Sequence, residues 1–307
     1  MDLTDIEIKK YIIANPRISY QAVADSVGIS IHAVHRRIKS MEENGIILGY
    51  KAYLSDSYIN AISVMVRGRI ESNSISDIID ILGKDERTEY ILQASGNQMF
   101  IGGLLRNIQE ITDYVDFVKD SDILIESETD IVYTIFPSLF KTGEYRVNKF
   151  PLTKNDIKII RLIKNDSRMS VMDIAKETGI STKTVNRRLQ KLIDEQVITL
   201  YTQFNLAKTG NFLVLLEIEK QNYAKFNQVI NVLINNCDPY LSSIMGIRNR
   251  SNNLYGEFWT ENMRDLMDII SKLDSYDEIR FLTPNIILDM YHFQSIRDEL
   301  EKNLRVG

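Results

Sequence analysis

The stretch that decides the fold reads GISIHAVHRRIK over residues 28–39, and a second stretch, GISTKTVNRRLQ, occupies residues 179–190. The similarity extends without a gap from residues 6–50 onto residues 157–201, at a constant offset of 151. Both copies keep a turn glycine, a serine that can cap a helix, an apolar stripe and a pair of arginines. This combination is typical of a helix-turn-helix that reads DNA, and its repetition builds the symmetry of a dimer into one chain.

Each copy, called a reader below, is expected to form three helices. Apolar residues recur at helical spacing in the first helix, and serines and glycines are expected to cap and to end the second, since serine accepts bonds from free amides and glycine takes left-handed backbone. These caps and ends are Ser19 and Gly28 in the first copy, and Ser170 and Gly179 in the second. The third helix begins after Ser30 or Ser181, and its single apolar stripe leaves the opposite face free for a partner.

The segments that follow each reader are predicted to be rich in strands. Residues 45–53 and 197–201 are short and β-prone, and they are interpreted as a two-stranded wing. The order βαββαβ then occurs twice, with first-half elements at 61–70, 75–82, 89–94, 99–105, 108–118 and within 123–135. The second-half elements are expected at 212–219, 223–234, 241–245, 254–259, 262–273 and 279–290. This order indicates an α+β fold with two ferredoxin-like domains.

Composition shifts predict five segments along the chain. They are a first winged helix-turn-helix (1–54), a first ferredoxin-like domain (55–136), a linker (137–151), a second winged helix-turn-helix (152–206) and a second ferredoxin-like domain (207–307).

The residues of the two readers carry a resemblance to a known family. Ala24, the GIS turn, the Val34 to Ile38 stretch and the run MEENGII at 41–47 are matched in the second copy by Ala175, its GIS turn, Val185 to Leu189 and residues 192–198. This arrangement resembles the Lrp/AsnC family of bacterial and archaeal transcription regulators. The resemblance implies one reader and one βαββαβ domain per protomer, and dimers whose sheets pack face to face. The chain is therefore similar to a fused pair of protomers.

The charge distribution agrees with a protein that docks its readers on DNA. The net charge is −5 and the pI is about 5.4. Residues 1–55 carry +1 and residues 152–206 carry +4, so the remainder carries −10. Positive charge on the readers and an acidic remainder favour one docked orientation and oppose indiscriminate phosphate binding.

The sequence also indicates where the protein works. It has no apolar run of the length a membrane span needs, and its amino terminus is acidic where a signal peptide would be basic, so we expect a cytoplasmic protein with no membrane partner. Cys237 is the single cysteine and is interpreted as a buried core residue. The sequence predicts no metal site and no cofactor.

Double-stranded DNA is the predicted partner, because a helix fits the major groove with its amino-terminal outward residues on the base edges. The candidate contacts of the first reader are Ser30, His32, Ala33, His35, Arg36, Arg37 and Lys39. Those of the second are Ser181, Thr182, Lys183, Thr184, Asn186, Arg187, Arg188 and Lys191. The first copy has histidines at two positions where the second copy has a lysine and an asparagine. We therefore expect the DNA site to be an imperfect palindrome with unlike half-sites.

Two turns are candidates for an effector site. The resemblance implies an amino-acid site near the turn between the second and third strands, where a glycine is followed by an acidic residue. The turns here have no carboxylate, and their candidate residues are Gly96, Asn97 and Gln98, and Gly246, Arg248, Asn249 and Arg250. The arginines of the second turn favour an anionic effector. A solvated loop without a ligand is the alternative.

Several alternatives remain open. Arg37 and Arg188 could brace the fold through carboxylates such as Glu43 or Asp194, and Lys39 could pair with Glu43 one helical turn away. The readers could serve an architectural protein that wraps DNA without an effector. The siroheme decarboxylases share the architecture of the family, but the only histidine outside the first reader is His292, so we expect a protein without enzymatic activity. A homo-oligomer is expected, with the βαββαβ domains pairing within one chain or between chains.

Overall fold

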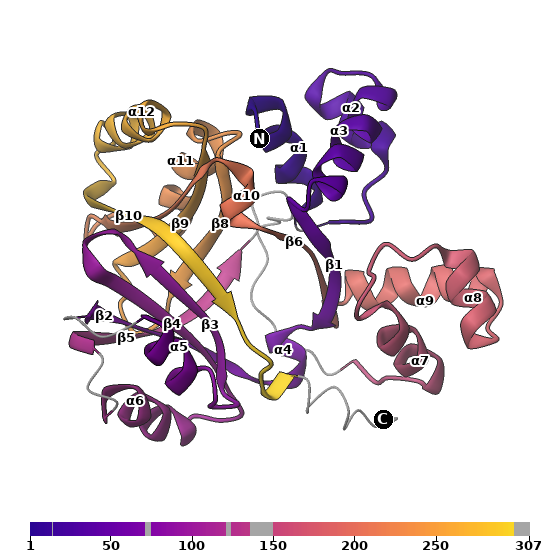
Figure 1. Ribbon diagram of the computed structural model, residues 1–307, viewed down its shortest axis with the longest axis horizontal. Coiled ribbons are helices and arrows are strands. Elements are labelled where there is room, and N and C mark those ends of the chain that lie inside the picture. Colours follow the sequence, from indigo (N-terminus) through magenta and orange to yellow (C-terminus); the bar gives the residue numbers. More distant parts are fainter. Residues whose placement is uncertain (14, 71–74, 121–123, 136–149, 298–307) are drawn as a thin grey trace. The chain divides into compact units, whose positions relative to one another are not determined.

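The computed structural model describes residues 1–13, 15–70, 75–120, 124–135 and 150–297. The chain divides into two compact units, each assembled from segments of both halves of the sequence (Figure 1). The barrel unit contains Met1–Lys10, Ile62–Lys141 and Thr209–Ser295, and the reader unit contains Tyr11–Ala61, Thr142–Lys208 and Ile296–Gly307. The units therefore do not follow one another along the chain. The linker expected at 137–151 falls almost entirely outside the described residues, and the domain boundaries stay a prediction.

The helices of the two readers form where the sequence predicts them. The first reader contains α1 (Leu3–Ile12), α2 (Tyr20–Val27), α3 (Ile31–Glu43), β1 (Ile47–Leu54) and the short α4 (Asp56–Ile59). The second contains α7 (Lys154–Ile163), α8 (Val171–Thr178), α9 (Thr182–Asp194), β6 (Ile198–Phe204) and the short α10 (Leu206–Thr209). The expectation of three helices in each copy is confirmed.

The predicted caps explain these helix boundaries. The Ser19 hydroxyl accepts a hydrogen bond from the Ala22 amide at 3.1 Å, and the Ser30 hydroxyl accepts one from Ala33 at 3.2 Å. Gly28 ends α2 with φ of 76°, a left-handed conformation that a residue with a Cβ adopts only at a cost. The stripes of α3 and α9 are buried, namely Val34, Ile38, Met41, Val185, Leu189 and Leu192. Burial of one stripe turns the opposite face of each helix outward.

The wing differs from its prediction. Among the described residues neither reader forms a strand pair of its own. Instead β1 pairs antiparallel with β6 of the other copy, from Ile47↔Phe204 to Leu54↔Ile198. The pairing nearly repeats itself under exchange of the copies, since Tyr50 faces Thr202 while Lys51 faces Tyr201, the residue matched to Tyr50. We call this pair the β1–β6 ribbon. It joins the two readers through backbone hydrogen bonds.

The barrel unit confirms the order βαββαβ in each half. The first half provides β2 (Ile62–Ile70), α5 (Ile75–Leu82), β3 (Thr88–Ala94), the 3₁₀ turn η1 (Ser95–Asn97), β4 (Gln98–Leu105), α6 (Glu110–Asp120) and β5 (Leu124–Ile135). The second half provides β7 (Phe212–Lys220), α11 (Phe226–Asn236), β8 (Leu241–Ile247), β9 (Asn253–Thr260), α12 (Met263–Asp274) and β10 (Ile279–His292).

The two four-stranded sheets close into one barrel with the strand order β10-β3-β4-β2-β5-β8-β9-β7. One seam is β5 against β8, from Val132↔Ile247 to Ile135↔Ile244. The other is the end of β10 against β3, from Ile287↔Ala94 to His292↔Tyr90. Of the two arrangements left open by the sequence, the intrachain one is therefore realised. Pairing along the sheet edges is an addition that the sequence did not predict, and it removes the open edges that isolated sheets would expose.

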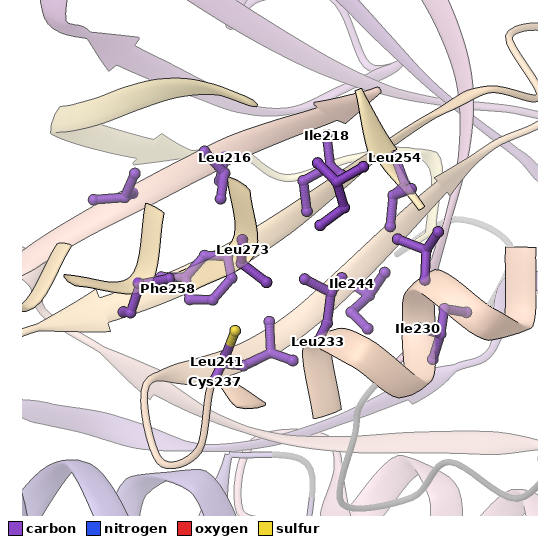
Figure 2. Packing of buried hydrophobic residues seen from close by; sticks show 14 of the residues in the cluster. Leu216, Ile218, Ile230, Leu233, Cys237, Leu241, Ile244, Leu254, Phe258 and Leu273 are labelled. Carbon is purple, nitrogen blue, oxygen red and sulfur yellow. The ribbon is translucent and has the colours of Figure 1, made fainter. Parts of the chain in front are cut away.

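Each sheet is covered on one face by its own helices and apolar core. In the second half, residues of β7, β8 and β9 pack against α11 and α12, as Figure 2 shows for Leu216, Ile244 and Leu273. Cys237 lies in this core with an exposed fraction of 1%, and burial raises the pKa of its thiol to about 12. The prediction of a buried structural cysteine is confirmed.

Candidate nucleic-acid interface

The outward face of α3 carries most of the residues predicted to read DNA in the first copy. His32, His35 and Arg36 are exposed, whereas Ala33 is half-buried. Ser30 is exposed and caps the helix. The free amides and the positive end of the helix dipole make such a helix start suitable for a phosphate. Three cationic or imidazole side chains and a helix start thus lie on one accessible face.

Two other candidates in the first reader have partly different surroundings. Lys39 is exposed and its Nζ lies 3.6 Å from a carboxylate oxygen of Glu43, which is the i,i+4 pair considered as an alternative. Such an exposed pair contributes only about 0.3–0.5 kcal/mol, so a phosphate can displace the carboxylate. Arg37 is half-buried beside the apolar stripe.

The second reader presents a more cationic face on α9. The exposed candidates are Ser181, Thr182, Lys183, Asn186, Arg187 and Lys191, and Thr184 is half-buried. The Ser181 hydroxyl caps the helix and donates to Thr184 Oγ1 at 2.9 Å. The ammonium of Lys191 lies 5.1 Å from the centre of the Phe150 ring. Lys183 and Asn186 therefore stand where the first reader has His32 and His35.

Arg188 departs from the predicted contact set. Its guanidinium donates to both carboxylate oxygens of Asp156, with Nε at 2.6 Å from Oδ1. The Asp156 side chain is fully buried and also caps α7 by accepting from the Thr153 amide at 2.7 Å. Desolvation would raise the pKa of this carboxyl, but the bonds from Arg188 and Thr153 outweigh it and hold the pKa below 3.8. Arg188 thus braces the reader, through Asp156 and not through the expected Asp194, and a contact of Arg188 with DNA stays a prediction.

The first predicted effector turn is a short exposed bend. Gly96 and Asn97 are exposed with left-handed φ of 69° and 59°, and Gln98 opens β4 half-buried. Ser95 Oγ accepts a hydrogen bond from the Ile286 amide at 3.3 Å, which ties this turn to β10. The three candidate residues therefore sit beside a seam of the barrel.

The residues of the second predicted effector turn make structural contacts within the barrel unit. Gly246 is buried in β8, where an added Cβ would lie 2.2 Å from Tyr133 Cζ. The Arg248 guanidinium stacks 4.7 Å from the centre of the same ring. Asn249 bonds to the backbone of β5, accepting from the Ile131 amide at 2.8 Å and donating to the Thr129 carbonyl at 2.7 Å. These contacts hold the turn against the neighbouring strand.

Arg250 does not offer the free cation that an anionic effector would need. Its guanidinium donates to both oxygens of the fully buried Asp130, at 2.7 and 2.8 Å, and to Glu217 at 2.9 Å. Arg67 of the opposite sheet donates to Glu217 at 2.7 Å, and the Tyr255 hydroxyl donates to Asp130 at 2.9 Å. Burial would lower the pKa of Arg250, but the bonds to the two carboxylates outweigh it and raise that pKa above its ordinary value. The charge of Arg250 thus already joins the two halves, and its part in binding an anionic ligand stays a prediction.

Within the part of the chain that the structure describes, no cluster of three histidine, cysteine or carboxylate side chains is arranged to hold a metal. Among the same residues, none of the helices has both the length and the apolar character needed to cross a bilayer.

Comparison with known proteins matches both readers. A family described as winged helix-turn-helix DNA-binding matches residues 1–47 and 152–199. A relative, an uncharacterised HTH-type transcriptional regulator of Pyrococcus abyssi, is 23% identical over 143 residues, which are 46% of this chain and 97% of that protein. The HTH-type transcriptional regulator LrpA of Pyrococcus horikoshii is 29% identical over 143 residues, 45% of this chain and 97% of that protein. The chain carries two winged helix-turn-helix segments and is similar to Lrp/AsnC-type transcriptional regulators.

The chain also resembles a solved structure along nearly all of its length. The match to the siroheme decarboxylase NirDL covers 97% of this chain and 96% of that one, with a TM-score of 0.58 and 11% identity. At this identity the likeness is one of fold.

A group of aromatic and cationic residues behind α3 was not predicted from the sequence. Tyr20, at the start of α2, sets its ring 5.5 Å from that of His35 in an edge-to-face contact. Arg168, which belongs to the second reader, stacks on Tyr20 and on Tyr50. One feature of the sequence could have indicated them, because Arg168 matches Arg17 at the repeat offset of 151.

Proposed function

We propose that the regulator binds one double-stranded DNA site with two unlike half-sites, reading one with α3 and the other with α9. The observation that carries this proposal is the β1–β6 ribbon, which joins two readers whose outward residues differ. A conventional dimer presents two identical helices and therefore matches a palindrome. Two different helices in one chain match a site whose halves differ.

The exposed side chains support different half-site preferences. Arginine can donate to both acceptors of guanine, and each reader exposes one such residue, Arg36 or Arg187. Asn186 can pair with both groups of the adenine edge, whereas His35 at the matched position has a single ring donor or acceptor on each side. Each bidentate contact discriminates by about 1–3 kcal/mol, so the exchange of asparagine for histidine is large enough to separate two sequences.

The test begins with selection of DNA from a random library at fixed salt. We expect wild-type protein to enrich a two-part motif, and Arg36→Ala/Arg187→Ala to bind the selected site at least about tenfold more weakly. The matched control is Lys119→Ala/Arg264→Ala, which removes the same charge from exposed positions of α6 and α12. A control that weakens binding as much as the reader variant would reduce the effect to net charge.

Symmetrised sites then test the difference between the readers. One probe carries two copies of the first half-site, and the other carries two copies of the second. The affinity of the protein for each probe is compared with its affinity for the selected site. The proposal expects the selected site to bind more tightly than either probe. Equal affinities for all three would contradict it.

Regulation by a small molecule and assembly into oligomers are further parts of this proposal. The effector candidates that remain accessible are Gly96, Asn97, Arg248 and Asn249. Thermal shift against amino acids and small carboxylates, with and without the selected DNA, tests for a ligand linked to DNA binding. Light scattering over a concentration series tests for a homo-oligomer of the fused chain.

The likeness of fold to NirDL favours a second candidate function, a siroheme decarboxylase-like enzyme. Proton transfer to a tetrapyrrole carboxylate calls for titratable side chains in the barrel unit, and His292 is exposed at the end of β10. The protein is mixed with an iron tetrapyrrole, and the absorption spectrum and the carboxylate content are followed. A bound spectrum with loss of carboxylate would support the enzyme, and an unchanged spectrum supports a regulator.

An architectural role without an effector is the remaining alternative. Nuclease protection on long DNA separates the two: evenly phased protected blocks indicate wrapping, and one short protected site indicates a local regulator.

A further inference from the structure

Arg168 lies in the second reader, but its guanidinium is held by the first. It precedes α8, and its Cζ lies 4.9 Å from the ring centre of Tyr20 and 4.8 Å from that of Tyr50. One of its nitrogens also donates to the Tyr50 hydroxyl at 3.1 Å. A planar guanidinium suits this position, because it can stack on an aromatic face and donate in its own plane at the same time.

Both tyrosines in turn contact side chains of α3. The Tyr20 ring meets the His35 ring edge to face, with 5.5 Å between centres and 73° between planes. The Tyr50 hydroxyl donates to the carboxylate of Glu42, near the end of the same helix. Arg168 is therefore connected to α3 at two points, one of which is a side chain proposed to read DNA.

The reciprocal contact has a different chemistry. Arg17, the residue matched to Arg168, donates to the backbone carbonyls of Ser167 at 2.7 Å and Met169 at 2.8 Å. At the positions matched to Tyr20 and Glu42 the second copy has Val171 and Ile193, which provide neither a ring nor a carboxylate. The second reader is thus held at its backbone before α8, whereas the first is held through side chains that reach α3.

We propose that Arg168 is a positioning residue through which the second reader sets α3 and His35 of the first, so that reading of the first half-site depends on both copies. This inference rests on the proposed function, because it assumes that α3 reads DNA. It makes the two readers unequal in a further sense, since Arg168 reaches α3 through two tyrosines, whereas Arg17 meets the second reader at backbone carbonyls before α8.

The experiment compares Arg168→Ala with Arg161→Ala, which removes an exposed arginine from α7 of the same reader. Each half-site is first assigned to its reader with the single variants Arg36→Ala and Arg187→Ala. We expect Arg168→Ala to lower affinity for a probe with two first half-sites by about tenfold, and for a probe with two second half-sites by less than about twofold. Arg168→Lys keeps the charge and is expected to recover only part of the loss. Equal losses on both probes would overturn the proposal.

A measurement without DNA keeps this proposal separate from the proposed function. Hydrogen exchange of wild type and Arg168→Ala is compared over α3 and α9 in the full chain. Faster exchange in α3 with unchanged α9 supports the positioning role even if no specific DNA is found, and unchanged protection of α3 overturns it. Should Arg168→Ala fail to fold, Tyr20→Val introduces the residue of the second copy at the matched position, and the same outcomes apply.

Discussion

Lys9 is a charged residue in a position that the repeat assigns to the core. It is fully buried in the barrel unit, and its Nζ donates to the Ser242 hydroxyl at 2.5 Å and lies 4.2 Å from the centre of the Trp259 ring. The matched residue of the second copy is Ile160. Loss of hydration lowers the pKa of Lys9 from 10.5 to about 7, against a smaller opposing effect of Glu257.

The stability of the protein is therefore expected to depend on pH through Lys9. Between about pH 7 and 10.5 the unfolded chain binds more protons at this residue than the folded one, so the free energy of unfolding rises with pH. Lys9→Ile should raise stability at pH 7 by up to a few kcal/mol and by less as the pH increases. Denaturant unfolding from about pH 6 to 9.5 measures the difference. Lys10→Ala is the control, and a gain for Lys9→Ile that is equal at every pH would contradict the prediction.

Substitutions of the two adjacent arginines of the second reader are expected to have different effects, one on stability and the other on DNA affinity. Arg188→Ala leaves the buried carboxylate of Asp156 without its main partner, so it should lower the free energy of unfolding by about 3–5 kcal/mol. Arg187→Ala removes an exposed side chain and should change stability by less than about 0.5 kcal/mol while weakening DNA binding. Denaturant unfolding and fluorescence anisotropy with labelled DNA measure the two quantities. The reverse pattern would identify Arg188 as a DNA contact and contradict its bracing role.

At the scale of elements, the sequence predicted the helices and strands whose bounds depend on neighbouring residues. Periodicity, Ser30 as a cap and Gly28 as a left-handed end fix the helices of the readers, and alternation fixes the strands of both halves. The pairing of β1 with β6 could not be predicted from local pattern. The β propensity of each strand is the same whether its partner lies in its own copy or in the other copy. The choice is made by distant groups, such as the Ile12 and Ile13 carbonyls that accept bonds from Thr202. The partner of Arg188 was missed for the same reason, since Asp156 is 32 residues away.

The β1–β6 ribbon is expected to fix the spacing of the half-sites. Thr202→Pro removes the amide that donates to the Ile13 carbonyl at 2.9 Å and places a ring in a paired strand, which should weaken the ribbon. The variant should bind sites whose half-sites are a few base pairs closer or farther apart nearly as well as the selected site. Gel shifts with a series of spacings measure this tolerance. Thr202→Ala keeps the amide and should retain the wild-type spacing, and a variant with an unchanged spacing optimum would contradict this role of the ribbon.

At the scale of the whole molecule, the barrel is built so that neither half completes it alone. Two seams join the halves, together with the charges of the buried Asp130 and of the half-buried Arg67, Glu217 and Arg250. Such a group of charges is stable only when every member has its partner, because an unpaired buried charge is costly. The sequence predicted the two ferredoxin-like patterns, but closure depends on pairs far apart in the chain, as between Asp130 and Arg250.

Separately encoded halves are therefore expected to assemble with each other. When the chain is divided between residues 137 and 149 and both parts are expressed together, a tag on one part should recover the other in a 1:1 ratio. Gly246→Val is the matched disruption, because its side chain would overlap Tyr133 at the β5–β8 seam. Recovery of each half as a stable monomer, or equal recovery with Gly246→Val, would contradict the prediction.

Because the β1–β6 ribbon joins two unlike readers, the bound protein also has a defined orientation along the double helix. A symmetric dimer looks the same from either end of its site, but here α3 faces one flank and α9 the other. If the proposed site is turned around upstream of a reporter gene, the opposite copy faces the start of transcription. Output that changes with the direction of the site would follow from this polarity, and equal output in both directions would speak against it.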